Sequence, residues 1–149
     1  MDTLITTLTV AAAVGSALIG GVFLIFSVTI MPALERVPAP QAVAVMQVIN
    51  RVIVKSLFLP VFLGTALLSV LVAAVAPGTL TIAGAILYVI GSLGVTMAAN
   101  VPLNNALDRV DAASASQAWA RYAGPWTLRN HVRAVASTAG SVVFVLALI

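Results

Sequence analysis

The residues best suited to chemistry form one stripe in the C-terminal apolar segment. In W126-T-L-R-N-H-V-R-A-V-A-S, Trp126, Asn130, Arg133 and Ser137 are spaced by four, three and four residues. This spacing places all four side chains on one face of a helix. Arginine and asparagine supply a positive charge and hydrogen-bond donors, which can stabilise negative charge that develops on a ligand oxygen. The same polar stripe could instead hold helices together, so a site and a structural network both remain open.

The only histidine of the chain, His131, stands beside this stripe. Successive helical residues are about 100° apart, so His131 lines up with Thr127 and Thr138 rather than with Asn130. Histidine exchanges a proton near neutral pH more readily than other side chains, which makes His131 a candidate base or haem ligand. Arg129 has a simpler interpretation, because basic residues at a membrane helix end commonly reach out to lipid phosphates.

A second polar face follows the third apolar segment. Asn100, Asn104 and Asp108 are four residues apart, so they share one face if the helix continues beyond Pro102. Proline here is expected to interrupt the helix and to free backbone carbonyls, which could then line a cavity. Asparagine side chains can hydrogen-bond a guanidinium across helices, so we expect Asn100 and Asn104 to face Arg133.

A third polar group precedes the second apolar segment. Gln47, Asn50, Arg51 and Lys55 lie on one face of a helix predicted over about 41–55. The pattern favours a solvated stripe on a helix that lies at the membrane surface. The alternative is that Asn50 or Arg51 faces the interior of the bundle.

Composition places these groups in an integral membrane protein. Of the 149 residues, 62% are hydrophobic and only 7% are charged, whereas a soluble domain has about 25% charged residues. Apolar segments of about 20 residues cross a bilayer as helices. Four such segments predict an all-α, four-helix transmembrane bundle in a single domain over residues 1–149, with spans at about 3–30, 56–75, 80–99 and 126–149.

The predicted spans are bounded by turn signals and by one polar loop. Span one is expected to end just before Pro32, and Pro60 predicts a kink near the start of span two. The polar loop at 101–125 contains Trp119 and Tyr122, three residues apart. Because indole and phenol rings prefer the membrane–water interface, we expect a short interfacial helix there, between spans three and four.

Loop charges predict the orientation of the bundle. All seven Lys and Arg residues lie in or beside the first and third connections, which share one side of the membrane in a four-span protein. The positive-inside rule assigns that side to the cytoplasm and both termini to the outside of a bacterial inner membrane. Small residues spaced by four, such as Ser16 and Gly20, allow close packing within the bundle and also permit a homodimer.

Several function classes are disfavoured by what the sequence lacks. The chain has no cysteine, which excludes disulfides and thiolate chemistry, and no dense basic patch for a nucleic acid. One histidine and four scattered acids argue against a metal site, so none is expected. The spans carry no carboxylate, which argues against a proton-coupled transporter. A protein that binds a lipid, haem or another small molecule remains open.

Four pieces of the sequence together resemble the DUF1772, or anthrone oxygenase-like, membrane proteins: F26-S-V-T-I-M-P-A-L, N100-V-P-L-N-N-A-L, Trp119 and W126-T-L-R-N-H-V-R. The resemblance extends from about Gly20 to the C-terminus, and its motifs are specific in combination. It implies a small four-span protein, and some fungal members of the family oxidise anthrones to anthraquinones. The motif residues are Pro32, Asn100, Pro102, Asn104, Trp119, Trp126, Asn130, His131 and Arg133.

The resemblance implies a cofactor-independent monooxygenase for a hydrophobic aromatic substrate, of anthrone or quinol type, at the cytoplasmic end of the bundle. His131 would act as the base, and Arg133 with Asn130 would hold the oxyanion. The substrate-binding residues would be Asn100, Asn104, Trp119 and Trp126. Haem on His131 is the alternative to having no cofactor. The alternative function is a small-molecule, haem or lipid-binding protein, or a small transporter, without turnover.

Overall fold

The computed structural model describes residues 2–149, and over this range it contains helices and no strand, which confirms the all-α prediction. Residues 2–149 form five continuous helices. The first comprises α1 (Thr3–Ile25), the π-helical turn η1 (Phe26–Ile30) and α2 (Met31–Leu34). Two shorter helices follow, α3 (Ala39–Ile53) and α4 (Phe58–Val75). The last two are α5 (Thr79–Tyr88) continued by η2 (Val89–Gly94), η3 (Thr96–Asn100) and α6 (Val101–Leu107), and then α7 (Ala115–Leu146).

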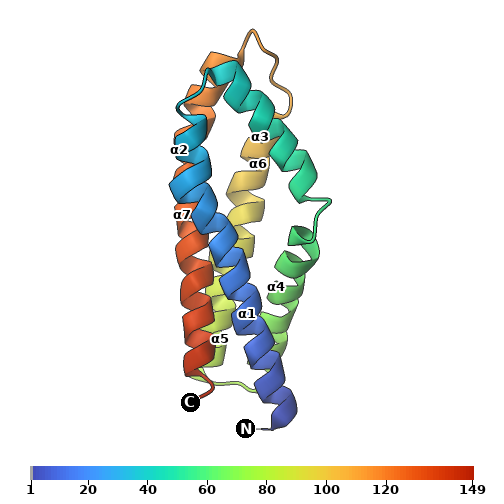
Figure 1. The fold of residues 1–149 in the computed structure, drawn as a ribbon. Helices are drawn as coiled ribbons and strands as arrows, with labels where there is room; N and C mark the ends of the chain where they lie inside the picture. The colour runs from blue at the N-terminus through green and yellow to red at the C-terminus, as the bar shows by residue number, and fades with distance from the viewer. Residues whose placement is uncertain (1) are drawn as a thin grey trace.

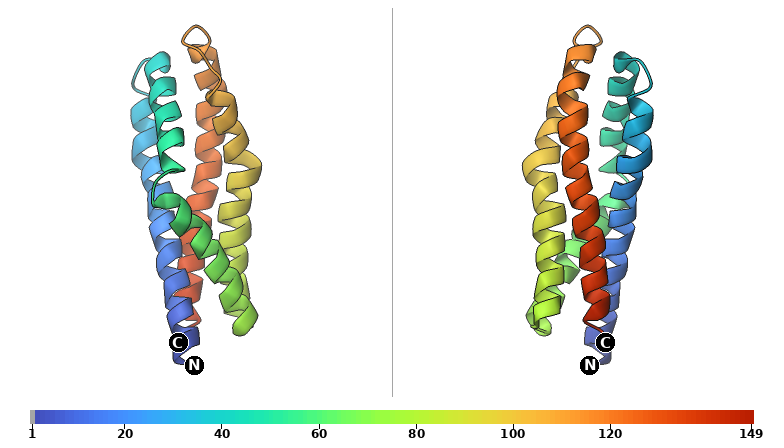
Figure 2. Two further views of the ribbon diagram at one scale, coloured as in Figure 1. Left: turned by 90° about the vertical axis from the view of Figure 1, so that its right-hand side faces the viewer. Right: turned by 90° about the vertical axis from the view of Figure 1, so that its left-hand side faces the viewer.

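The long helices α1–α2, α5–α6 and α7 run alongside one another (Figure 1). Both termini lie at one end of the bundle, and the α2–α3 and α6–α7 connections lie at the other. The remaining side is built from α3 and α4, which meet at an elbow over residues 54–57 (Figure 2). Because the elbow turns the chain, α3 covers the half of the bundle near the connections and α4 covers the half near the termini.

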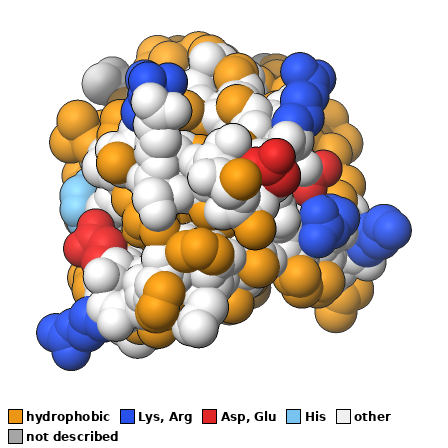
Figure 3. Space-filling view, turned by 90° about the horizontal axis from the view of Figure 1, so that it is seen from above, with side chains coloured by type: hydrophobic (Ala, Val, Ile, Leu, Met, Phe, Trp, Pro, Cys, Tyr) orange, Lys and Arg blue, Asp and Glu red, His pale blue; other side chains and the backbone are white. Residues whose placement is uncertain are grey.

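The end opposite the termini is the charged end of the bundle. Charged side chains are spread around this end, among apolar ones (Figure 3). In the α6–α7 connection, the backbone N–H of Ser114 donates to Asp111 Oδ1 at 2.9 Å. This hydrogen bond holds the pKa of the Asp111 carboxyl below its usual range.

Among residues 2–149, three helices are long and apolar enough to cross a membrane, which indicates a membrane protein: Thr3–Leu34, Phe58–Val75 and Thr79–Leu107. The predicted fourth span, 126–149, falls within α7, which is not among them. α7 is long enough, but Arg129, His131 and Arg133 make its middle too polar. The structure therefore supports three of the four predicted spans by length and composition.

The short interfacial helix predicted between spans three and four is not a separate element. α6 continues to Leu107 and α7 begins at Ala115, so Trp119 and Tyr122 belong to α7. Both side chains are buried. Their rings lie 5.7 Å apart, and the Tyr122 ring stacks on Trp126 at 6.2 Å. The prediction was wrong because these rings pack on one another inside the bundle rather than at a membrane surface.

Two prolines that were expected to end or interrupt helices lie within continuous ones. Pro32 and Pro102 each follow a π-helical turn, η1 and η3. In η3, the turn closes with the N–H of Val101 bonded to the carbonyl of Thr96, five residues back. A proline ring clashes with the carbonyl four residues back in a regular α-helix, and the wider turn relieves this clash. The helix beyond Pro102 therefore carries Asn104 on into the bundle.

The elbow, rather than Pro60, is where the chain bends. Pro60 lies in the first turn of α4. A backbone N–H at this position would have no acceptor within the helix, so its absence in proline costs little. Ser56 Oγ accepts from the N–H of Phe58, the first residue of α4, at 3.2 Å. The predicted kink within span two is therefore replaced by a break before it.

Small residues bring α1 and η2 close to α7. A Cβ atom added at Gly20 would lie 2.8 Å from Thr138 Oγ1, and one added at Gly91 would lie 2.5 Å from the Cβ of Ala136. Larger side chains at either position would push the helices apart. The predicted use of the Ser16 and Gly20 spacing in packing the bundle is thus confirmed for Gly20.

Candidate functional site

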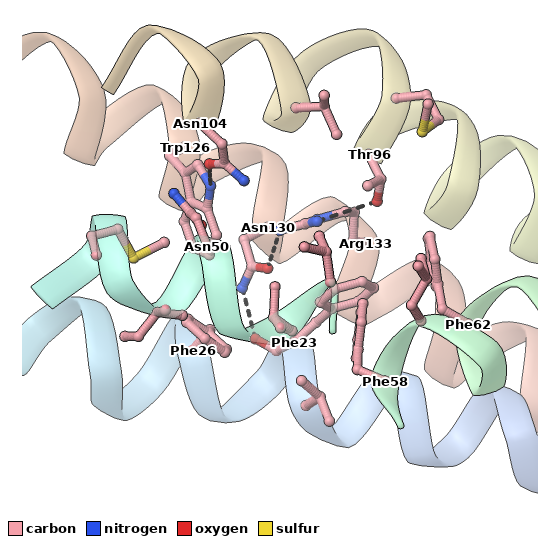
Figure 4. Close-up of a pocket in the computed structure, with 18 of the residues that line it drawn as sticks. Phe23, Phe26, Asn50, Phe58, Phe62, Thr96, Asn104, Trp126, Asn130 and Arg133 are labelled. Carbon is pink, nitrogen blue, oxygen red and sulfur yellow. Dashed lines mark hydrogen bonds between the residues drawn. The ribbon is translucent and has the colours of Figure 1, made fainter. Parts of the chain in front are cut away.

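A cavity of about 330 Å³ lies where α3 meets α4, between the elbow and the three long helices. Figure 4 shows its walls, which combine rings with a few polar groups. The aromatic lining residues are Phe23, Phe26, Phe58, Phe62 and Trp126. The polar lining residues are Asn50, Thr96, Asn104, Asn130 and Arg133. A cavity with flat apolar walls and few, converging polar groups suits an aromatic ligand that carries oxygen.

Arg133 is the one charged residue of this lining. Its side chain is only 5% exposed. Nη2 donates to Asn130 Oδ1 at 2.6 Å, and Nη1 donates to Thr96 Oγ1 at 3.2 Å. The guanidinium carbon lies 4.2 Å from the centroid of the Phe23 ring. Rings and neutral polar groups thus surround the cation, and Nε has no hydrogen-bond partner among residues 2–149.

No carboxylate neutralises Arg133. Within the described part of the chain, the ion pair found joins Arg51 and Asp108, at 2.6 Å on the surface of the charged end. A buried cation without a counter-charge is unfavourable, and it favours binding of a negatively charged group. The positive charge of Arg133 therefore favours binding of an anion in the cavity, or of a ligand that becomes anionic as it reacts.

Asn130 holds Arg133 in place. It is fully buried, and its Nδ2 donates to the carbonyl of Phe23 and to Ser27 Oγ, both at 2.7 Å. Ser27 lies in η1, so the π-helical turn supplies part of this support. With Oδ1 bonded to Arg133, the asparagine fixes the guanidinium between α1 and α7. The predicted stripe of Trp126, Asn130, Arg133 and Ser137 is confirmed as a buried face.

Asn104 is hydrogen-bonded to two aromatic side chains, and not to Arg133 as predicted. Its Oδ1 accepts from Tyr122 Oη and from Trp126 Nε1, both at 2.8 Å. Asn100 Nδ2 donates to the carbonyl of Trp126 at 3.3 Å. The guanidinium instead bonds to Thr96, which lies one turn before Asn100 on the same helix. The expected contact of Asn100 or Asn104 with Arg133 is therefore replaced by a scaffold around Trp126.

Replacing Asn104 by Leu is expected to lower the free energy of unfolding by about 2–4 kcal/mol, because two buried donors would lose their shared acceptor. Titration with SDS in mixed micelles, followed by helical circular dichroism, measures this change. Asn105→Leu is the matched control, since Asn105 is exposed on the same helix. Equal stability of the two variants would show that the Asn104 hydrogen bonds contribute little.

α3 closes the cavity and is fastened to the end of α6. Gln47 Nε2 donates to the carbonyls of Leu107 and Val110 at 2.9 and 3.0 Å, and Arg51 pairs with Asp108. Between these two anchors, Asn50 faces the cavity. The predicted stripe of Gln47, Asn50, Arg51 and Lys55 is therefore not one solvated face, and the alternative of an inward-facing Asn50 is confirmed.

The cavity reaches the outer surface through an apolar mouth. Val54, Leu63 and Met97 line the cavity, and each is also about half exposed, at 54%, 48% and 58%. Val54 lies in the elbow, Leu63 in α4 and Met97 in η3. The mouth therefore opens sideways from the bundle, between the elbow and the third predicted span.

Three predicted site residues do not line the cavity. His131 is exposed on α7 and is not part of the lining, while Trp119 and Asn100 are buried outside the lining. Residues 2–149 hold no cluster of three or more His, Cys, Asp or Glu side chains that could bind a metal ion.

A family model matches this chain over residues 45–143, which include 99 of its 149 residues, and its description is anthrone oxygenase. The chain belongs to the anthrone oxygenase family. It has no significant match among curated proteins or among solved structures. The matched region includes Asn50, Asn104, Trp126 and Arg133, so most of the polar lining lies within the part that this member shares with the anthrone oxygenase family.

The cavity of this anthrone oxygenase family member also contains residues that the sequence did not single out. Phe23, Phe58 and Phe62 pack around Arg133 or against one another, with ring centroids about 5 to 6 Å apart. Thr96 is the unexpected partner of the guanidinium. Phenylalanines in apolar spans carry no distinguishing pattern, but Thr96 lies four residues before Asn100 on the face already predicted to be polar.

Proposed function

We propose that this membrane protein oxidises a hydrophobic aromatic carbon acid of the anthrone type with O2, in the cavity around Arg133. The observation that carries the proposal is a buried guanidinium without a carboxylate partner, placed among aromatic rings. Family membership supports the same reaction class.

The chemistry requires an anion that the cavity is suited to stabilise. Loss of a proton from the methylene carbon of an anthrone leaves negative charge that spreads to the oxygen across the central ring. The proton passes to solvent. The electron-rich anion reacts with O2, the methylene carbon becomes a carbonyl, and the second oxygen atom leaves as water, which takes up that proton and the remaining methylene hydrogen. One anthrone and one O2 thus give one anthraquinone and one water. The step that needs the protein is formation of the anion.

Arg133 would stabilise this anion through its positive charge. Asn130 and Thr96 fix two corners of the guanidinium, so it would not reorganise as charge develops. Phe23, Phe26 and Trp126 provide flat walls for the rings of the substrate. Together these groups would hold and stabilise the reacting anion.

Oxygen uptake in lipid nanodiscs tests this function. We expect anthrone to be converted to anthraquinone with one O2 consumed per molecule, faster than in protein-free nanodiscs of the same lipid. Anaerobic samples serve as the control, since they should bind anthrone without forming product. Binding without catalysed oxygen uptake would refute the enzyme assignment and favour the alternative, a small-molecule-binding protein.

Replacing His131 by Ala is expected to change the oxidation rate by no more than about twofold, because the imidazole lies outside the cavity. Positioned bases typically contribute about 10²–10⁴-fold, so the test separates the two roles clearly. The measurement is oxygen uptake at saturating anthrone. A loss of more than tenfold, with unchanged helical content, would restore His131 as the base that the sequence predicted.

The topology follows from the same arrangement. α4 has 18 residues and is therefore about 27 Å long, close to the roughly 30 Å of a bilayer core. With α4 across the membrane, the elbow and the cavity mouth lie at one boundary of the core. We infer that α7, which packs along α1 and α5 (Figure 2), is the fourth span. The positive-inside rule then places the charged end in the cytoplasm.

A further inference from the structure

Most of the cavity wall is apolar, and the space that it encloses needs an apolar occupant. Of the 19 lining residues, 14 are apolar. The rings of Phe23, Phe58 and Phe62 gather on one side of Arg133 (Figure 4), with ring centroids 5.3 to 6.1 Å apart. Side chains around a void lose dispersion contacts, and apolar walls do not hold ordered water. An apolar group is therefore the occupant that suits this space.

The mouth joins the cavity to the hydrocarbon of the bilayer. Leu63, at the mouth, lies five residues after Phe58, the first residue of α4, and so about 7 Å along the helix. With α4 across the membrane, Leu63 lies inside the hydrocarbon core. Leu67 lies one turn farther along α4, Ile90 lies two turns before Met97, and both are more than half exposed. The surface beside the mouth is thus apolar, and acyl chains are the molecules that adjoin the mouth.

We propose that an acyl chain of a membrane lipid enters through this mouth and fills the apolar part of the cavity when no other ligand is bound. The chain passes from one apolar surrounding into another, so its transfer carries no desolvation penalty. It gains contacts with the aromatic walls, and they gain contacts with it. The cavity is therefore a lipid-binding site as well as the proposed site of oxidation.

The cavity can hold a large part of such a chain, and the chain can be displaced. A methylene group is about as large as a water molecule, which takes roughly 30 Å³ of the liquid. The volume of about 330 Å³ thus corresponds to on the order of ten methylene groups. However, an acyl chain offers no negative charge to Arg133. A ligand that supplies one, in addition to apolar contacts, binds more tightly and competes with the lipid.

Fluorescence of Trp126 in nanodiscs of brominated lipid tests this assignment. The chain has two tryptophans, and Trp119→Phe leaves only Trp126, which lines the cavity and is 4% exposed. The full-length protein is compared in phosphatidylcholine brominated in the middle of one acyl chain and in the same lipid without bromine. Bromine quenches indole emission at short range. We expect emission about twofold lower in the brominated lipid, because a chain in the cavity comes within about 4 Å of the ring.

Variants of the mouth separate a chain in the cavity from lipid outside the bundle. Leu63→Phe with Met97→Phe narrows the mouth and should restore most of the emission. Leu67→Phe with Ile90→Phe is the matched control, since it adds the same side chains at exposed positions outside the lining, and it should leave the quenching unchanged. Leu63→Ala with Met97→Ala widens the mouth and should increase the quenching, which keeps the test decisive if the narrowed variant does not fold. Quenching that is absent, or equal in all these variants, would overturn the assignment.

Discussion

Arg133→Gln is expected to lower kcat/KM for anthrone oxidation by about 100- to 1,000-fold, the range found when one donor to a developing oxyanion is removed. The loss corresponds to about 2.7–4 kcal/mol of transition-state stabilisation. Glutamine keeps a polar group near Asn130 and Thr96 but removes the charge that the cavity otherwise leaves unbalanced. The fold should tolerate the change, because removing a buried charge also removes its desolvation penalty.

Initial rates of oxygen uptake over a range of anthrone concentrations measure this effect. Arg129→Gln is the matched control, because Arg129 lies one helical turn earlier on α7 and does not line the cavity. Arg133→Lys should recover only part of the activity, since an ammonium cannot bond to Asn130 and Thr96 with a planar fork. Wild-type rates in Arg133→Gln would remove the guanidinium from the mechanism and with it the proposed site.

Asn130→Asp is expected to lower kcat/KM by about 10- to 100-fold although Arg133 is untouched. The new carboxylate would lie where Oδ1 accepts from Nη2, at 2.6 Å, and would neutralise the guanidinium. An internal counter-charge competes with the substrate anion for the same cation, which weakens stabilisation of the transition state. The variant thus tests whether charge, rather than shape, is what Arg133 contributes.

Stability measurements accompany the kinetics of this variant. The aspartate would also face the carbonyl of Phe23, which now accepts from Nδ2, so part of the gain from the ion pair is offset. Ser27→Ala is the control, since it removes one support of Asn130 without adding charge. If Asn130→Asp and Ser27→Ala reduce activity equally, positioning of Arg133 matters and its free charge does not.

The polar half of the site could be predicted because residues at helical spacing in the sequence lie on one face of the folded helix. Trp126, Asn130 and Arg133 recur at helical spacing on a helix that is continuous from 115 to 146, so their common face followed from the sequence. The hydrogen-bond partners of Arg133 were harder to predict. The partner of the guanidinium depends on how far the two helices are offset along their axes, and periodicity does not determine that offset. It therefore could not decide between Thr96, Asn100 and Asn104.

The apolar side chains of the site could not be predicted, because the segments that carry them are apolar on every face. Phe23, Phe58 and Phe62 look like any other lipid-facing or buried residue in their segments. Two further features depend on local backbone geometry. The π-helical turns before Pro32 and Pro102 shift the faces of their helices, and the elbow at 54–57 turns Asn50 inward. None of these follows from hydrophobicity alone.

The mouth at Val54, Leu63 and Met97 opens sideways from the bundle. The ligand concentration that determines occupancy of the cavity is then the concentration in the lipid. A ligand that enters from the bilayer is sampled at its mole fraction in the lipid, not at its molarity in the surrounding buffer. If the proposed function holds, adding more lipid at constant total anthrone would dilute anthrone in two dimensions and slow its oxidation at an unchanged amount of protein. Anthrones, being flat and apolar, are concentrated in membranes well above their aqueous level. A modest intrinsic affinity at the cavity is then sufficient for efficient capture.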